Sequence, residues 1–423
     1  MTTTHPAQPS PAPASAGLFG WWRDGTDDAR RALIAAGLGW MLDAFDVMLY
    51  GLLLPSIIAD LQLTNRTAGA IGSVTLLAAA GGGLVFGVVA DRYGRTRALM
   101  ASVLIYSIFT AACGFAYSAV QLAIFRILLG IGMGGEWASG AALVSESWPA
   151  AHRGKALGLM QSAWAIGYGL AALVTLIVLP RWGWRAVFFV GVLPALLTLW
   201  VRRNVREPEL WVRSRGADRR RGRLADVFGE GRAAVTVAVT LMNACTLFAW
   251  WGFNLWLPGF LSMPASAGGI GLSAQQMSWF IIAMQVGMWF GYVTFGYVGD
   301  AIGRKRAYVA YLIAAALLIA IYTSVHAPLV LLLLGPFVAF FATGYFSGFG
   351  AVTAEIYPTD VRATAQGFTY NLGRIASAAA PWTVGALAQT RGFDVALSTT
   401  SVAFALAAIL WLWIPETSGR RLT

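Results

Sequence analysis

Five charged residues lie inside long apolar stretches of this chain, where a charge needs either a partner or a function. Asp43 and Asp46 are three residues apart and would share one face of a helix. Arg126 and Glu136 lie in a second apolar stretch, and Arg374 lies in a third. A charge near the middle of a bilayer costs at least about 2.5–3.5 kcal/mol. We therefore expect these five groups to be compensated or functional.

The acids have the chemistry to carry a proton. Burial favours the neutral form of a carboxylic acid and a nearby arginine favours the charged form. A change in the distance between Asp46 and Arg126 would therefore load and unload one proton. A permanent structural ion pair is the alternative. Asp43 could replace Asp46 in this role, and Glu136 could be a proton site, a packing partner or a substrate contact.

Arg374 indicates an anionic cargo. It lies about ten residues into its apolar stretch, with Tyr370 one helical turn away and Asn371 beside it. A permanent cation at that depth favours an anion. Pairing with Glu355 or another acid of the bundle is the alternative. Three buried acids and two buried arginines keep the same total charge when one proton enters with one monoanion, so electroneutral symport is plausible.

Aromatic and amide side chains recur at helical spacing and could form the walls of a site. Such stripes more often pack or face lipid, but the added amide and hydroxyl groups favour a cavity. A flat carboxylate with an apolar body would suit these walls. The candidates are Gln161, Trp164, Tyr168, Asn243, Trp250 and Asn254, with Gln285 and Ser347 as weaker ones.

Long helices in a bilayer must position these residues. Of 423 residues, 58% are hydrophobic and 12% are charged, about half the charged share of a soluble domain. Apolar stretches bounded by Gly or Pro are long enough to cross about 30 Å of hydrocarbon as helices. We predict an all-α integral membrane protein with twelve spans, at 32–58, 67–90, 98–117, 121–146, 155–179, 184–202, 233–257, 275–299, 307–325, 328–356, 364–388 and 393–414.

One short charged signature occurs twice. Gly87-x-x-x-Asp91-Arg92-x-Gly94-Arg95 recurs 209 residues later as Gly296-x-x-x-Asp300-x-x-Gly303-Arg304. Internal repeats in a membrane protein are typical of a transporter built from two related halves. The same offset relates further pairs, namely Glu146 and Glu355, Arg153 and Arg362, Gly183 and Gly392, and Glu207 and Glu416.

The repeated charges could latch helix ends together. Asp91 and Asp300 can accept hydrogen bonds from cationic side chains or helix N-termini. Ordinary loop charge would explain the arginines but not acids repeated in register. We expect salt bridges among Arg92, Arg95, Glu146, Arg153, Arg304, Glu355 and Arg362.

The distribution of basic residues orients the chain. Of its 30 Lys and Arg residues, only Arg66, Arg181, Arg185 and Arg391 fall in loops opposite the N-terminus, so the positive-inside rule predicts two cytoplasmic ends. Topology and anionic lipid explain the net charge of +11 better than nucleic acid does. We expect a disordered tail (1–30), a six-helix bundle (31–202), a linker (203–231), a second bundle (232–414) and a short C-terminus (415–423).

Several other functions are disfavoured. The sequence contains no Walker A motif, which argues against an ATP-driven pump. The three histidines and two cysteines form no metal-ligand pattern. The glycine run at 130–135 lies in an apolar span without a preceding strand, so helix packing explains it better than a nucleotide loop. We expect no enzyme activity and no cofactor.

The repeated signature, with Arg126-x-x-x-Gly130, resembles the major facilitator superfamily over essentially everything after residue 30. Gly134-Gly135-Glu136-Trp137 and Pro415-Glu416-Thr417 look like its metabolite:proton symporters, which carry aromatic acids, sialic acid and other organic anions and are related to sugar porters and organic ion transporters. The resemblance implies alternating access in the plasma membrane (the inner membrane of a bacterium), usually by a monomer, with charge clusters that hold the outward-open state.

The resemblance also implies two residue roles. Sugar porters couple proton movement through an acid of span 1 and an arginine of span 4, which Asp46 matches loosely and Arg126 matches well. Organic anion transporters carry a span 11 arginine that favours carboxylates, as Arg374 would. The sequence thus predicts a proton-driven importer of an organic carboxylate. A neutral sugar or polyol porter, an exporter of drugs or metabolites and a non-transporting sensor are the alternatives.

Overall fold

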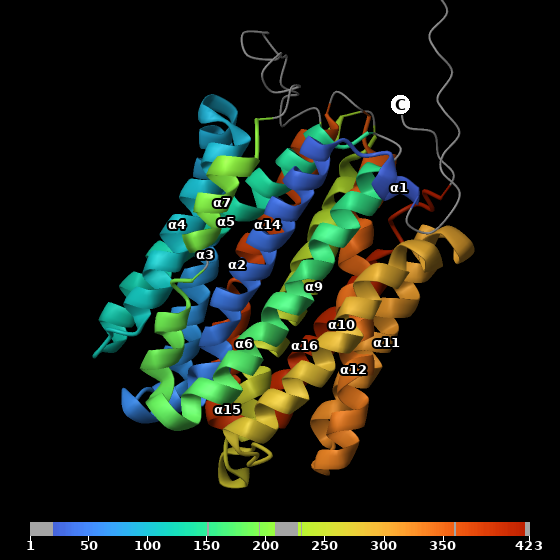
Figure 1. Ribbon diagram of the computed structural model, residues 1–423. Coiled ribbons are helices and arrows are strands. Elements are labelled where there is room, and N and C mark those ends of the chain that lie inside the picture. The colour runs from blue at the N-terminus through green and yellow to red at the C-terminus, as the bar shows by residue number, and fades with distance from the viewer. Residues whose placement is uncertain are drawn as a thin grey trace, which may run out of the picture.

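Long helices lying side by side form the whole described part of the protein (Figure 1). The structure is a computed structural model, and it describes residues 20–149, 152–193, 195–207, 227–229, 231–358 and 361–418. In these ranges no β-strand occurs. Residues 1–19 of the predicted tail, 208–226 of the predicted linker and 419–423 of the predicted C-terminus lie outside the described residues.

The described part of the first half of the chain holds seven helices, five of them with 19 or more residues. They begin and end as follows: α1 Gly20–Arg23, α2 Asp27–Asp60, α3 Asn65–Tyr93, α4 Arg95–Cys113, α5 Ala119–Ser147, α6 Arg153–Val190 and α7 Ala195–Asn204.

The second half repeats this pattern with more interruptions. Its elements are α9 Ala233–Ser262, η2 Ala265–Ala267, α10 Ala274–Ile302, α11 Arg304–Ser324, α12 Pro328–Gly344, η3 Tyr345–Gly348, α13 Phe349–Ile356, α14 Arg362–Ser377, α15 Ala379–Arg391 and α16 Phe393–Leu410.

Ten helical stretches are long and apolar enough to cross a bilayer, and two further crossings are composite. Gly183 has φ 73° inside α6 and turns the chain, so the part of α6 after it and α7 together make one crossing. α14 and α15 are each shorter than a bilayer span, but together they cover 362–391. These additions give the predicted twelve crossings, most of them within a few residues of the predicted boundaries.

The internal repeat is visible in the backbone. Gly94 and Gly303 both end a helix with positive φ, at 116° and 98°. Gly183 and Gly392 share this feature at 73° and 84°. An L-residue rarely adopts such angles, whereas glycine does so without steric cost. The equal positions in the two halves therefore require glycine for the same reason, namely a tight turn between two crossings.

The structure differs from the predicted disordered tail at residues 20–30, where Gly20–Arg23 forms α1 and α2 begins at Asp27. Trp21 and Trp22 of α1 pack against Trp148 at the end of α5, with ring centroids 5.1 and 6.0 Å away. The indole N–H of Trp148 also donates to the carbonyl oxygen of Ala29 at 2.8 Å. We call the side of the molecule that carries α1 and the start of α2 the α1 end, and the opposite side the far end.

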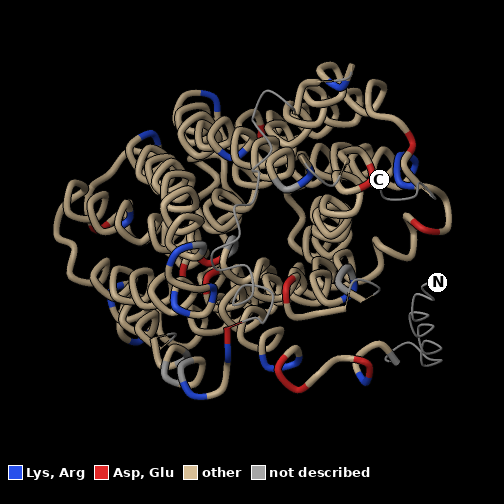
Figure 2. Tube along the Cα trace, turned by 90° about the horizontal axis from the view of Figure 1, so that it is seen from above, with Lys and Arg blue, Asp and Glu red and all other residues tan. Residues whose placement is uncertain are grey.

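The two halves meet closely at the far end. The backbone N–H of Arg66 on α3 donates to Oε1 of Gln389 on α15 at 3.3 Å. A side chain at Gly69 would overlap the carbonyl oxygen of Pro381. Viewed from the α1 end, most helices run nearly along the line of sight around a common centre (Figure 2). Close backbone contact through glycine is a usual device of helix packing in membranes, and here it joins α3 to α15.

Candidate functional site

A cluster of charged side chains lies at the middle of the helices. Asp43 lies 16 residues after the first residue of α2 and 17 before its last, so it is at the midpoint of that helix. Asp46 follows on the same face. Both are 1% exposed, and Glu136 of α5 is fully buried. The structure therefore brings together the three acids that the sequence singled out.

These acids make no direct bond. Neither carboxylate oxygen of Asp43, Asp46 or Glu136 accepts a hydrogen bond from any described residue. No salt bridge within 4.0 Å involves them in the described part of the chain. A permanent ion pair between Asp46 and Arg126, the alternative that the sequence left open, is therefore absent from this conformation. Unpaired buried carboxyl groups are costly, which favours a functional reason for their position.

Arg126 of α5 is 2% exposed and lies against an aromatic ring. Its guanidinium carbon is 4.6 Å from the ring centroid of Tyr50 on α2. The same side chain borders a cavity of about 10 Å³ between the halves, with Trp251 and Leu255 of α9 and Pro381 of α15 on the other side. A cavity of this size holds about one water molecule. Arg126 thus faces the seam between the halves and not the lipid.

Arg374 approaches the cluster from the second half. It lies near the end of α14 and is 6% exposed. No hydrogen bond or salt bridge of its guanidinium is found among the described residues, and Glu355 pairs instead with Arg304 at 3.7 Å. Arg374 acts electrostatically on Asp43, more strongly than Arg126 does. The buried cation therefore faces an acid of the opposite half without a direct bond.

A row of indole rings crosses the seam beside these charges. Trp40 of α2 and Trp164 of α6 have centroids 4.6 Å apart, and Trp164 continues to Trp250 of α9 at 5.7 Å and to Trp251 at 6.3 Å. The indole nitrogens of Trp40, Trp164 and Trp250 are buried and find no acceptor among the described residues. Buried indole N–H groups usually have one, so this wall presents donors to whatever lies between the halves.

The amide candidates divide into two groups. Oε1 of Gln161, Oε1 of Gln285 and Nδ2 of Asn243 are buried without a hydrogen-bond partner in the described ranges. Asn254 and Asn371, by contrast, donate to the carbonyl oxygen four residues before them in their own helix. The first three therefore have polar capacity to spare, whereas the last two use part of theirs within the helix.

Tyr168 and Tyr370 also differ from each other. The hydroxyl of Tyr168 on α6 donates to the backbone oxygen of Asn254 on α9 at 3.3 Å, which ties the two halves together. Tyr370 packs on Phe349 at 5.6 Å and acts electrostatically with Arg374. Tyr168 thus has a structural contact across the seam, while Tyr370 accompanies the buried cation.

The repeated charges at the α1 end pair within each half. Arg95 binds Glu146 at 3.0 Å in the first half. Arg304 binds Asp300 at 2.7 Å and Glu355 at 3.7 Å in the second. The Nε group of Arg362 donates to the carbonyl oxygen of its neighbour Tyr357. The side chains of Asp91 and Arg153 are outside the described set, Arg92 is exposed, and a gate across the halves stays a prediction.

Sequence reasoning missed three members of the site. Trp40 lies three residues before Asp43 and so on the same helical face, a spacing that would have revealed it. Tyr50 follows Asp46 by four residues and could have been found in the same way. Phe346, whose ring is 6.3 Å from that of Trp250, lies in η3, where the helix is interrupted and no periodicity points to it.

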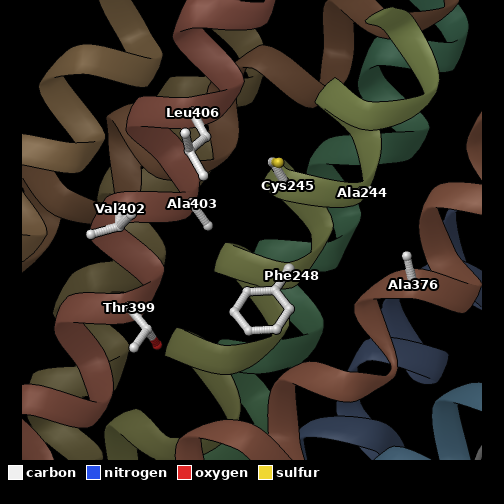
Figure 3. Close-up of a pocket in the computed structure, with 8 residues that line it drawn as sticks. All are labelled: Ala244, Cys245, Phe248, Ala376, Thr399, Val402, Ala403 and Leu406. Carbon is white, nitrogen blue, oxygen red and sulfur yellow. The ribbon is translucent and has the colours of Figure 1, made fainter. Parts of the chain in front are cut away.

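A second cavity, larger than the one beside Arg126, lies away from the candidate site. Its volume is about 330 Å³, and Figure 3 shows the residues of α9, α14 and α16 that line it. Val402 and Leu406 in its wall are 58% and 49% exposed on the outer face of the second half. None of the candidate site residues lines it. Its lining is apolar and it opens outward, so we regard it as a groove toward lipid.

A metal is not indicated by the geometry. Within the described ranges no group of three His, Cys, Asp or Glu side chains is arranged to hold an ion. The site is a buried cluster of polar and aromatic side chains, with two buried cations, three buried acids and several indole N–H groups that have no acceptor in the described residues.

Comparisons with known proteins agree with this geometry. The profile of the Major Facilitator Superfamily matches residues 36–264 and 240–423. The chain is 34% identical over 409 residues to the "Probable 4-methylmuconolactone transporter" of Cupriavidus pinatubonensis, covering 95% of this chain and 94% of that one. It is 32% identical over 394 residues to the sialic acid transporter NanX of Escherichia coli, covering 92% and 95%.

A solved structure shares the fold. The xylose transporter XylE of Escherichia coli in a partially occluded inward open conformation matches with a TM-score of 0.75 at 21% identity, covering 94% of this chain and all of that one. The sequence, the two six-helix bundles and the duplicated signature lead to one conclusion: the chain is a multi-pass membrane transporter that belongs to the Major Facilitator Superfamily.

Proposed function

We propose that this protein is a secondary transporter that moves an organic carboxylate together with protons by alternating access. The observation that carries the proposal is the placement of Arg374, a buried cation without a hydrogen-bond partner among the described residues, at the seam between the halves. A buried arginine that can form a bidentate pair with a carboxylate gives both affinity and orientation. Relatives named for sialic acid and methylmuconolactone transport support an organic acid.

The aromatic wall suits a cargo with an apolar body. The rings of Trp40, Trp164 and Trp250 offer flat faces on one side of the seam, and their N–H groups offer donors. The amides of Gln161 and Gln285 would bind further polar groups of the cargo. A carboxylate on Arg374 with its body against these rings would receive hydrogen bonds from both halves of the carrier.

Proton coupling would follow from the acids of the first half. Arg374 acts on Asp43 across the seam, so a bound carboxylate competes with Asp43 for the same cation. Once the cargo neutralises Arg374, the charged form of Asp43 loses stabilisation and takes up a proton. Arg126 also acts on Asp46, within the first half, but less strongly than Thr110 and Asp43 do. Cargo binding and protonation would then favour each other, which is the condition for symport.

Alternating access would begin from the conformation seen here. The halves join at the far end, through Arg66 and Gln389 and through Ser73 and Trp382. The repeated salt bridges at the α1 end stay within each half. With the basic α1 end in the cytoplasm, this arrangement corresponds to a carrier closed toward the outside. We place the protein in the plasma membrane, with both ends cytoplasmic.

A neutral sugar or polyol is the second candidate cargo. The unpartnered amides of Gln161 and Gln285 favour it, because hydroxyl groups can both donate to and accept from an amide. Uptake into proteoliposomes distinguishes the two. Labelled benzoate, N-acetylneuraminate and xylose are supplied with and without an inward proton gradient. We expect at least one acid to accumulate only with the gradient. Accumulation of xylose, with neither acid entering nor competing, would refute the carboxylate assignment.

A further inference from the structure

Seven polar side chains on three helices of the first half are buried in the described structure. Each is at most 1% exposed. Six of them make no hydrogen bond of ordinary geometry in the described residues, although Thr110 acts on Asp46, and the seventh, Tyr106, donates only a long bond of 3.4 Å to the carbonyl oxygen of Gly39. We call this group the polar seam, as distinct from the seam between the two halves. It consists of Asp43 and Asp46 of α2, Tyr106, Ser107 and Thr110 of α4, and Glu136 and Ser139 of α5.

Packing alone does not account for the polar seam. Each buried polar group without a partner costs about 1–3 kcal/mol, and apolar residues of the same size would avoid this cost. Four of the groups are hydroxyls, which can both donate and accept. The remaining three are carboxyl groups, which can bind and release a proton. Buried hydroxyl and carboxyl groups gathered in one bundle are the components of a path for protons.

The carboxyl groups form a ladder along the helix axis. Asp46 and Asp43 lie 19 and 16 residues from the first residue of α2, and Glu136 lies 11 residues before the last residue of α5. At 1.5 Å per residue these positions are about 28, 24 and 16 Å from the α1 end. Glu136 is therefore the member nearest the α1 end, and Asp46 is the farthest from it.

Gly39 allows Glu136 of α5 to lie close to α2, the helix that carries Asp43. Gly39 lies one turn before Asp43 on α2, and a side chain there would overlap Oε1 of Glu136. Glu136 and Asp43 act on each other electrostatically, and the hydroxyl of Tyr106 lies in the field of both and of Asp46. Asp43 and Tyr106 are thus the titratable groups that interact with Glu136 among the described residues.

We infer that the polar seam is a proton path and that Glu136 is its release group toward the α1 end. The inference rests on the proposed symport. A proton taken up at Asp46 or Asp43 passes to Glu136: the O–H bond of the donor carboxyl breaks as an O–H bond forms on the acceptor carboxylate, directly or through a seam hydroxyl. The number of protons does not change, and one negative charge moves in the opposite direction.

The route narrows beyond Glu136. A Cβ built on Gly140 of α5 would lie 3.2 Å from Cε of Met160 on α6, 3.4 Å from Cβ of Ala36 on α2 and 3.6 Å from Oε1 of Glu136. These small and apolar groups separate Glu136 from the α1 end in this conformation. Release of the proton requires α6 to move Met160 aside, which couples release to the motion of the helices.

The test compares Glu136→Gln with wild type in proteoliposomes, and Asp394→Asn is the matched control because Asp394 is exposed and outside the site. The cargo is whichever of benzoate and N-acetylneuraminate the wild type transports. Its exchange across the membrane without a proton gradient reports binding and helix motion. Its accumulation with a gradient reports proton coupling. We expect E136Q to keep exchange within about twofold and to lose accumulation by about tenfold or more, because only the coupled step needs the proton. Normal accumulation, or loss of exchange as well, would overturn the inference.

A second measurement needs no cargo. Infrared difference spectra of the reconstituted carrier between acid and neutral pH show the carbonyl bands of protonated carboxyl groups. We expect E136Q to remove one band and Asp43→Asn to shift it, because the two groups interact. An unchanged spectrum in both variants refutes the path. Failure of wild type to accumulate either acid, with these bands present, would count against the proposed cargo and not against the path.

Discussion

Asp43 of α2 and Arg374 of α14 belong to opposite halves of the carrier, and Arg374 is the cation that acts most strongly on that acid. Neither carboxylate oxygen of Asp43 has a hydrogen-bond partner among the described residues, and no salt bridge within 4.0 Å joins the two side chains. A charge pair that is close enough to interact, yet not joined, can be rearranged by a third charged group at little cost. This relationship is the physical basis of the proposed coupling between cargo and proton.

Replacing Arg374 should strongly weaken recognition of the cargo carboxylate. Arg374→Ala removes the cation, and a charged hydrogen bond is worth about 1.5–3 kcal/mol, so uptake at low substrate concentration should fall about 10- to 100-fold. Arg374→Lys keeps the charge but not the bidentate geometry and should recover only part of the uptake. Arg391→Gln, an exposed arginine at the end of α15, is the control and should transport normally. Equal loss in both would contradict the assignment.

Asp46→Asn should separate transport from the proton gradient. The amide mimics the neutral acid permanently, so exchange of labelled acid across the membrane should continue while accumulation against a gradient is lost. Proteoliposomes with an internal pH dye measure both. Asp60→Asn at the far end, where Asp60 binds Arg185 at 2.7 Å, is the control for an acid outside the polar seam. If D46N still accumulates the labelled acid with a gradient, Asp46 is not the group that takes up the coupled proton. Asp43→Asn then tests whether Asp43 takes it up.

The indole N–H of Trp164 should contribute to binding separately from its ring. Trp164→Phe keeps an aromatic face but removes the donor, and we expect a loss of about 1 kcal/mol in cargo affinity, a typical value for one hydrogen bond. Trp164→Ala also removes the contacts to Trp40 and Trp250 and should lose more. Trp413→Phe, exposed on the outer face, is the control. If W164F binds like wild type, the indole serves packing only.

The carboxylate of Glu416 should stabilise the second half in a pH-dependent way. It accepts hydrogen bonds from the backbone N–H groups of Arg304 and Lys305, which begin α11, at 3.0 and 3.2 Å. Burial alone would raise the pKa of Glu416, but the N–H donors of Ser418, Thr417, Lys305 and Arg304 outweigh it and hold the pKa below its ordinary value of 4.5.

A lowered pKa in the folded state means that this stabilisation is present at neutral pH and is lost as the pH falls through the folded-state pKa. Glu416→Gln should therefore lower the free energy of unfolding at neutral pH by about 0.5–1 kcal/mol, the lower part of the range for helix caps, because the group is exposed. Thermal unfolding at several pH values tests this. A difference from wild type that persists unchanged in acid would contradict it.

Locking the far end should stop transport. Cysteines in place of Arg66 and Gln389, in a chain whose Cys113 and Cys245 are replaced by Ala, can be joined by a short thiol cross-linker. Because alternating access requires α3 and α15 to separate there, we expect cross-linking to block uptake and reduction to restore it. The uncross-linked double variant is the control. Full uptake in the cross-linked carrier would show that this contact does not open during transport.

Much of the fold could be predicted because the bilayer imposes it. Spans such as 275–299 are recognisable from length and apolar content, and glycines at equal positions in the repeat, such as Gly94 and Gly303, mark the turns. The burial of Asp43, Arg126 and Arg374 follows from their apolar surroundings. These properties depend on local sequence, so one chain without any relatives is sufficient to show them.

Features that depend on packing between helices could not be predicted. α1 has only four residues and owes its place to the ring of Trp148, 125 or more residues along the chain from it. The hydroxyl of Tyr168, which the sequence suggested as a cargo contact, donates to the carbonyl oxygen of Asn254 instead. The partner of Glu355 is Arg304 and not Arg374, and only the three-dimensional arrangement of α11, α13 and α14 decides between them.

Binding of a matched pair of ligands tests the central claim most directly. Benzoate and benzamide have nearly the same shape and differ in charge, and the tryptophans of the site report binding by fluorescence. We predict that wild type prefers benzoate by about tenfold or more, equivalent to about 1.4 kcal/mol, and that Arg374→Ala removes this preference while R391Q keeps it. An equal affinity of wild type for both ligands, or a preference that survives in R374A, would contradict a carboxylate site at Arg374.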